Sequence, residues 1–259
     1  MRWLHTSGLL ITIGEQVLCR GLDLELRAGQ CWGLLGQNGI GKSTLLHTLA
    51  GLRPAAAGSV YLQDQAIGRL SRTRVSRLLG LLLQDSTDPF PATVIETALL
   101  GRHPHLSRWQ WEGENDFRIA QAALDSVGLG ALKERRIDTL SGGERRRLAL
   151  ATLLTQQPSV MLLDEPTNHL DPAQQIRMLS LLTDGIATMA SGRPGVLLMS
   201  LHDINMAARF CSHLLLMLPQ GEVMSGPAAE LLETAVLERL YGYPLIRIEH
   251  DAGVAFLPR

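Results

Sequence analysis

The sequence contains only three cysteines, Cys19, Cys31 and Cys211. The number is odd, and the spacing matches no metal-binding pattern. We therefore expect reduced, mostly buried thiols, as in a cytosolic protein.

Long hydrophobic runs are also missing. The longest runs, such as Leu214–Leu218, are far shorter than the ~20 residues that cross a bilayer. Residues 1–7 lack the long apolar core of a signal peptide. We expect a chain that is soluble by itself, so that any membrane role comes through a partner.

An excess of one charge is the third absence, since 24 Lys and Arg residues stand against 25 Asp and Glu residues. This balance gives no argument for nucleic acid, and we expect no nucleic-acid partner. One local basic cluster is spaced like a helix face, and a solvated face is favoured over a phosphate-binding patch. Its members are Arg69, Arg72, Arg74 and Arg77.

Hydrophobic residues, in contrast, make up 46% of the 259 residues, enough for a sizeable core. This length is common for one α/β domain with an inserted lobe. We predict a single domain with a core at 1–84 and 139–233, a helical lobe at about 85–138 and a C-terminal extension at 234–259. The lobe is indicated by prolines, two tryptophans and a helical pattern that follow Gln84.

The expected fold class is α/β with a mainly parallel central sheet and an N-terminal antiparallel β subdomain. Continuous apolar runs, typical of strands covered on both faces, are Val160–Leu163, Val196–Met199 and Leu214–Leu218. Residues 9–35 alternate like strands, which predicts that Leu9, Ile11 and Ile13 share one face. The tail predicts a short helix and two strands around 251–253.

The stretch Gly36–Ser43 fits the pattern G-x-x-x-x-G-K-S. It follows an apolar strand and precedes a helical pattern, as a phosphate-binding loop requires. Glycines let backbone N–H groups approach phosphate oxygens, Lys42 should reach the β- and γ-phosphates, and Ser43 should bind Mg²⁺. The expected nucleotide-binding residues are Gly36, Gln37, Asn38, Gly39, Ile40, Gly41, Lys42, Ser43 and Thr44.

Two carboxylates, Asp164 and Glu165, follow the apolar run at 160–163. By itself this pattern is equally typical of a helix N-cap. After a phosphate-binding loop, catalysis is favoured: Asp164 should hold Mg²⁺ and Glu165 should polarise the attacking water.

Gln84 and His202 also stand at strand ends. His202 is either a capped or surface residue, or a donor to the γ-phosphate. Gln84 is either a surface side chain or a ligand for metal and water.

In this order, the motifs resemble the ATP-binding subunit of an ABC transporter. They are the Walker A loop, the Q-loop Gln84, the signature Leu140–Glu144, the Walker B run Val160–Glu165, the D-loop Asn168–Asp171 and the switch His202. The resemblance covers nearly the whole chain and implies a P-loop NTPase fold, ATP and Mg²⁺ as cofactors, and catalytic roles for Lys42, Gln84, Glu165 and His202.

The resemblance also implies a head-to-tail dimer of two copies, with each ATP between one Walker A loop and the other copy's signature. Nucleotide contacts are then expected from Ser141, Gly142, Gly143 and Asp171. The family further implies integral-membrane permease subunits, a periplasmic or surface substrate-binding protein, and a place on the cytoplasmic face of the membrane.

Two positions depart from the family pattern. Many relatives stack adenine on an aromatic residue expected near Ile13, and no aromatic lies between Trp3 and Trp32. Adenine is then held by apolar packing or by Trp3, and GTP remains possible. Arg146 replaces a frequent glutamine; we expect little effect, because arginine can still donate hydrogen bonds.

The segment Leu99–His105 and the tail resemble the subfamily that serves metal-chelate importers of ferric siderophores, haem or cobalamin. Cobalamin or a ferric siderophore is favoured. His103 and His105 are interpreted as surface loop residues rather than metal ligands. The alternatives are a soluble ABC-type ATPase of translation, DNA repair or iron–sulfur assembly, and a non-hydrolysing nucleotide-gated scaffold.

Overall fold

The computed structural model describes residues 1–84, 91–168, 170–186, 194–250 and 253–259. A six-stranded sheet in the order β11-β10-β4-β9-β8-β7 forms its centre, and only β11 runs antiparallel to its neighbour. The strands are β4 (Cys31–Gly36), β7 (Leu79–Leu82), β8 (Val160–Leu163), β9 (Val196–Ser200), β10 (His213–Met217) and β11 (Val223–Pro227). The predicted parallel sheet is confirmed.

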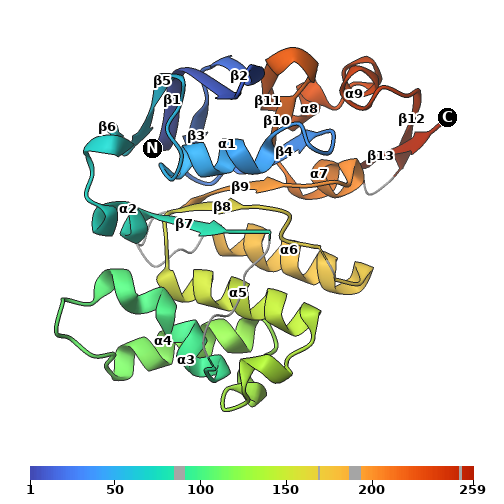
Figure 1. The fold of residues 1–259 in the computed structure, drawn as a ribbon. Helices are drawn as coiled ribbons and strands as arrows, with labels where there is room; N and C mark the ends of the chain where they lie inside the picture. Colours follow the sequence, from blue (N-terminus) through green and yellow to red (C-terminus); the bar gives the residue numbers. More distant parts are fainter. Residues whose placement is uncertain (85–90, 169, 187–193, 251–252) are drawn as a thin grey trace.

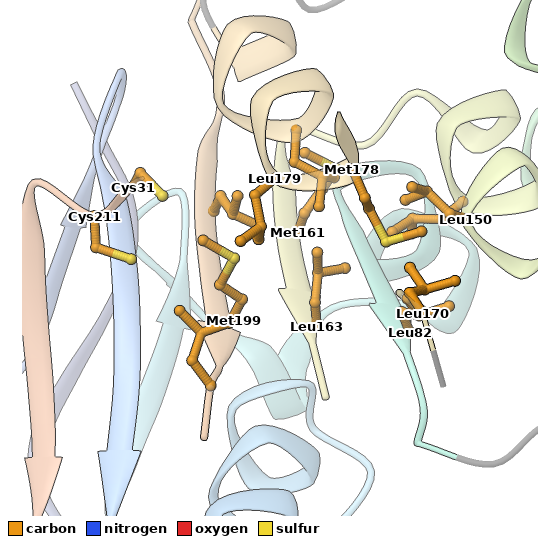
Figure 2. Close-up of a cluster of buried hydrophobic side chains, with 14 of the residues drawn as sticks. Cys31, Leu82, Leu150, Met161, Leu163, Leu170, Met178, Leu179, Met199 and Cys211 are labelled. Atoms are coloured by element: carbon orange, nitrogen blue, oxygen red, sulfur yellow. The ribbon is translucent and has the colours of Figure 1, made fainter. Parts of the chain in front are cut away.

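The apolar runs of the central strands supply two hydrophobic cores at once. Because side chains alternate along a strand, Met161 and Leu163 enter the core on one face, while Val160 and Leu162 enter the core on the other. Figure 2 shows the first of these cores, where the sheet packs against Met178 and Leu179 of α6 (Pro172–Ile186). This two-sided burial explains why the strands carry no polar face.

A second, antiparallel sheet covers the other face of the central sheet together with α1 (Lys42–Leu49) (Figure 1). Its strands are β1 (Arg2–Ile13), β2 (Gln16–Leu22), β3 (Glu25–Arg27), β5 (Ala57–Leu62) and β6 (Gln65–Ala66). The alternation at 9–35 predicts part of this sheet but misses residues 2–8 of β1.

The three residues expected on one face of β1, Leu9, Ile11 and Ile13, differ in burial at the end of the strand. Leu9 and Ile11 are 0% and 1% exposed, whereas Ile13 is 46% exposed. Ile13 is the last residue of β1 and pairs with Gln16 beside the turn into β2, so the buried part of this face ends at Ile11.

A helical lobe lies on the far side of the central sheet from the antiparallel sheet (Figure 1). Within it, α3 (Val94–Leu99) and α4 (Glu114–Ser126) pack on α5 (Gly142–Gln156). Short 3₁₀ helices cover 100–105, 130–132 and 137–139, and α2 (Arg72–Leu78) and a 3₁₀ turn at 67–69 precede β7. The predicted lobe residues 85–90 lie outside the described residues.

The C-terminal extension packs back onto the core. After a 3₁₀ turn at 219–221 and α8 (Ala228–Leu231), it forms α9 (Thr234–Tyr241) and a hairpin of β12 (Leu245–His250) and β13 (Gly253–Pro258). Asn205 of α7 (Ile204–Phe210) holds β13 by two hydrogen bonds to the backbone of Phe256. The predicted helix and strand pair are present; residues 251–252 lie outside the described part.

Several surface and burial expectations can also be compared. Cys19, Cys31 and Cys211 are all buried, as predicted, and the arginines at 69, 72, 74 and 77 are exposed. Among the described residues, no helix is both long and apolar enough to span a bilayer.

The predicted surface loop at His103 and His105 is partly wrong. His103 is exposed, but His105 is partly buried in a 3₁₀ helix, where its Nε2 lies 2.8 Å from the carbonyl oxygen of Gln156. Arg102 between them is buried and donates to Asp116 Oδ1 at 2.7 Å. This segment therefore links α4 and α5 of the lobe by hydrogen bonds.

The Asp116 carboxylate should stabilise the lobe in a pH-dependent way. The Gly113 backbone N–H and then Arg102 lower the pKa of this carboxyl. Its contribution is therefore fully present above the unfolded-state pKa of about 3.9 and is lost as the pH falls through the lower folded-state pKa. Asp116→Asn should reduce the free energy of unfolding at pH 7 by about 2–3 kcal/mol, measured by urea denaturation.

The control is Asp138→Asn, which removes an exposed pair with Arg136 and should leave the denaturation midpoint nearly unchanged. Equal effects of the two substitutions would contradict a special role of the buried pair.

Candidate functional site

Four parallel strands end at one edge of the central sheet, and each delivers a predicted site residue there. The glycine-rich loop follows β4, Gln84 follows β7, Glu165 follows β8 and His202 follows β9. Ligands of open α/β sheets bind outside the carboxyl ends of the strands. A cavity of about 510 Å³ lies at this edge and is lined by Ile13, Gln16, Leu18, Asn38, Gly39, Gly41, Lys42, Ser43, Thr44, Gln84, Glu165 and His202.

The glycine-rich loop needs its glycines for a steric reason. Gly41 has a φ of +109°, and a Cβ there would lie 2.7 Å from Leu18 Cδ1. A Cβ on Gly36 would lie 2.9 Å from Ile40 Cγ2. The chain can therefore turn sharply from β4 into α1, whose N-terminus borders the cavity and favours an anion.

Lys42 begins α1 and is only 6% exposed. Its Nζ donates to the carbonyl oxygens of Gly36 at 2.8 Å and of Gln37 at 3.2 Å. Burial lowers the pKa of this amine, while the nearby Glu165 and Asp164 raise it. The ammonium group is thus held at the floor of the cavity, where its field acts on a bound anion.

The other predicted loop residues divide into two groups. Asn38, Gly39, Ser43 and Thr44 line the cavity together with Gly41 and Lys42. The cavity wall does not include Gly36, Gln37 and Ile40. The Gln37 amide instead donates to the Leu240 carbonyl at 3.0 Å in the C-terminal extension, and Ile40 packs on the core shared with the antiparallel sheet.

Glu165 and His202 meet at the cavity. The His202 Nε2 lies 2.5 Å from Glu165 Oε1, and the Asn168 amide donates to the other carboxylate oxygen. The Glu165 side chain is 11% exposed, and its backbone has a φ of +47°. The N-cap alternative does not account for these contacts, which aim the carboxylate at the same space as Lys42.

Ser200 contacts both predicted carboxylate residues, a contact that the sequence patterns do not reveal. It is fully buried at the end of β9; its Oγ donates to Asp164 Oδ1 at 2.7 Å and accepts the Glu165 N–H at 2.8 Å. Asp164 itself is 2% exposed and lies behind the cavity wall. The sequence offered one signal for this contact: Ser200 is a hydroxyl residue at the end of the apolar run that forms β9, the strand beside β8.

The signature residues lie elsewhere. Ser141 is the N-cap of α5: its Oγ accepts the Glu144 N–H, and the Glu144 carboxylate accepts the Ser141 N–H at 2.8 Å. Neither Ser141 nor Gly142 nor Gly143 lines the cavity, and Ser141 and Gly142 are exposed. Asp171 is also exposed and accepts the Gln174 N–H at the start of α6; His169 of the same predicted D-loop lies outside the described residues.

The structure distinguishes between the two predicted ways of holding adenine, by Trp3 or by apolar packing. Trp3 is 3% exposed and its indole N–H donates to the Pro194 carbonyl at 2.8 Å, so the alternative that Trp3 holds adenine is wrong. The described cavity wall contains Ile13, Gln16 and Leu18 and no Phe, Tyr or Trp. Apolar packing on Ile13 and Leu18 is the alternative that fits.

The oxygen donors suit a magnesium ion. The Ser43 hydroxyl and the Gln84 amide are on the cavity wall, and the Asp164 carboxylate lies behind them. Mg²⁺ prefers one or two carboxylate or hydroxyl oxygens together with phosphate oxygens and water. The residues therefore fit this ion.

Comparison with known proteins agrees with this geometry. Residues 19–168 match the family model for ABC transporters. The ferric enterobactin transport ATP-binding protein FepC of Escherichia coli (strain K12) is 36% identical over 92% of this chain and 87% of its own length. The iron(3+)-hydroxamate import ATP-binding protein FhuC of Bacillus subtilis (strain 168) is 37% identical over 93% of this chain and 88% of its own length.

A solved structure supports the same assignment. An inward-facing ABC transporter described as of the metal-chelate type aligns with a TM-score of 0.85 at 26% identity, over 100% of this chain and 98% of that one. The chain therefore belongs to the ABC transporter family. It is an ATP-binding, ATP-hydrolysing subunit coupled to import, so the transporter prediction is favoured over the soluble ABC-type ATPases.

Ser200→Ala should impair hydrolysis more than nucleotide binding. It leaves the Glu165 N–H and Asp164 Oδ1 without their shared hydroxyl, which loosens the carboxylates by fractions of an ångström. We expect kcat for ATP hydrolysis to fall about 10-fold while KM changes by less than about twofold. The control Ser126→Ala removes a hydroxyl that bonds only within the lobe, to the Ala123 carbonyl, and should leave kcat unchanged. A wild-type kcat in Ser200→Ala would contradict the role of the hydroxyl.

Proposed function

We propose that this chain powers a metal-chelate importer as a head-to-tail dimer that binds two MgATP. One observation supports the dimer. The exposed signature at the start of α5 lies outside the cavity of its own chain, although the wall of that cavity contains residues of the glycine-rich loop, Gln84, Glu165 and His202. A second copy would bring Ser141 and Gly143 to that cavity.

Within the cavity, the roles follow from the contacts. Lys42 and the N-terminus of α1 bind the β- and γ-phosphates. Ser43, Gln84 and Asp164 would hold Mg²⁺, which would neutralise phosphate charge. Glu165 orients the attacking water and accepts its proton, and His202 holds the Glu165 carboxylate in place through Nε2.

The partner's signature would complete the site electrostatically. Gly142 and Gly143 are the first residues of α5, and Ser141 and Gly142 are exposed at the positive end of the helix dipole. ATP would then bind the closed dimer more tightly than the open one, and hydrolysis would remove this difference. Asp171 would act across the same interface.

A ferric siderophore is the proposed substrate class. FepC and FhuC carry ferric enterobactin and iron(3+)-hydroxamate in their names. By analogy, the chain works with permease subunits and a substrate-binding protein, at the cytoplasmic face of the membrane. The substrate itself would contact those partners rather than this cavity.

Glu165→Gln tests the catalytic role. The amide cannot accept a proton from water, so we expect turnover to fall by about 10²–10⁴-fold, while ATP affinity is retained and an ATP-bound dimer accumulates. Hydrolysis assays, nucleotide binding and size-exclusion chromatography measure these three results.

The matched control is Glu230→Gln on α8, an exposed carboxylate remote from the cavity, which should turn over ATP normally. Turnover near wild type in Glu165→Gln would show that Glu165 is not the base. In cells, Glu165→Gln should also stop iron uptake from ferric siderophores; continued uptake would reject the substrate proposal.

Lys42→Ala and Ser141→Arg test the shared sites. Each variant alone should lack hydrolysis, because Lys42→Ala loses phosphate binding and Ser141→Arg blocks the signature. In a mixture, the heterodimer pairs an intact loop of one copy with an intact signature of the other, and about a quarter of wild-type activity should return when pairing is random. A mixture as inactive as either variant would rule out the head-to-tail arrangement.

A further inference from the structure

A guanidinium group lies buried directly beneath the catalytic carboxylates. Arg146 is on the second turn of α5 and is 7% exposed. Five hydrogen bonds run from its guanidinium group to backbone carbonyl oxygens of the described residues. Nε donates to Pro166 at 3.2 Å, Nη1 to Leu83 at 2.5 Å and Gln84 at 3.1 Å, and Nη2 to Asp164 at 2.6 Å and Glu165 at 2.7 Å.

These carbonyls stand where the sheet ladder stops. The pairing of β7 with β8 ends at Leu82 and Leu163, and a last bond joins the Asp164 N–H to the Leu82 carbonyl. Beyond that point, the chain continues from β7 to Gln84 and from β8 to Glu165, and the two segments no longer pair as strands. Buried carbonyl groups need donors, and Arg146 supplies them to both chains at once.

Glu165 depends on such support because its backbone is strained. A φ of +47° in a residue other than glycine costs about 1–3 kcal/mol. Ser200 Oγ accepts its N–H at 2.8 Å, and Arg146 binds its carbonyl at 2.7 Å. The residue is thus held on both sides, and this conformation directs the carboxylate to His202 and the cavity.

We propose that Arg146 is a positioning residue for hydrolysis, which holds the backbone of Glu165 and Gln84 in the geometry that the reaction needs. The inference rests on the proposed role of Glu165. Arg146 does not line the cavity, so it acts through the residues whose carbonyls it binds. Its effect should therefore fall on turnover rather than on ATP binding.

Side-chain chemistry provides a graded test. Glutamine offers two N–H donors in place of five, and methionine fills similar space with none. Since a misplacement of about 1 Å can cost about 100-fold in rate, we expect kcat to fall about 100-fold in Arg146→Met and less, about 10-fold, in Arg146→Gln. KM for ATP should stay within about twofold of wild type in both.

The matched control is Arg147→Met, the same substitution one position further along α5. Arg147 donates to the carbonyls of Val127 and Gly128 in the helical lobe, far along the chain from Glu165. Its kcat should remain near wild type. Thermal melting and ATP binding show whether each variant is folded; if both Arg146 variants fail to fold, Arg146 supports the fold alone and the proposal is wrong.

A double-mutant cycle separates this inference from the proposed function. If Arg146 acts through Glu165, Arg146→Gln should not slow the Glu165→Gln protein further. Normal turnover in Glu165→Gln would show that Glu165 is not the general base. Arg146 would then have no catalytic residue to position. Loss of turnover in Glu165→Gln, together with wild-type kcat in folded Arg146→Met, would overturn the Arg146 inference alone.

Discussion

The shared direction of β4, β9, β8 and β7 is the constraint on which the rest of the structure depends. Parallel strands end at one edge, so four segments that are far apart in the chain open onto one cavity. Both faces of the sheet are covered, one by helices and the other by the antiparallel sheet and α1, so the strands are apolar on both faces. The same arrangement that makes the two cores also makes the site.

The sequence predicted what is encoded locally. The loop at 36–43, the carboxylates after β8 and the central strands follow from patterns of a few adjacent residues. What it missed depends on register and packing. Ile13, beside the turn from β1 into β2, lies on the cavity wall, and the Trp3 indole N–H is instead bonded to the Pro194 carbonyl. The contact of Ser200 with Asp164 exists only because β9 lies beside β8.

The site combines a rigid floor with a one-sided opening. Lys42, Ser200 and Asp164 are all buried, so their charges and hydrogen bonds are shielded from water and act strongly. His202, in contrast, has a side chain that is 42% exposed. A bound nucleotide would therefore meet fixed groups on one side and solvent on the other, where a second molecule can approach.

The five acceptors of Arg146 have a consequence for how this protein can diverge. Every residue has a carbonyl group, so substitutions at Leu83, Pro166 or their neighbours need not remove the acceptor atoms. The contacts thus restrict the residue type at position 146 but not at the positions whose carbonyl groups it binds. Pairwise co-variation among homologous sequences would carry little trace of these carbonyl contacts, although they join three segments of the chain. Such a cluster can be recognised only when the backbone is placed in three dimensions.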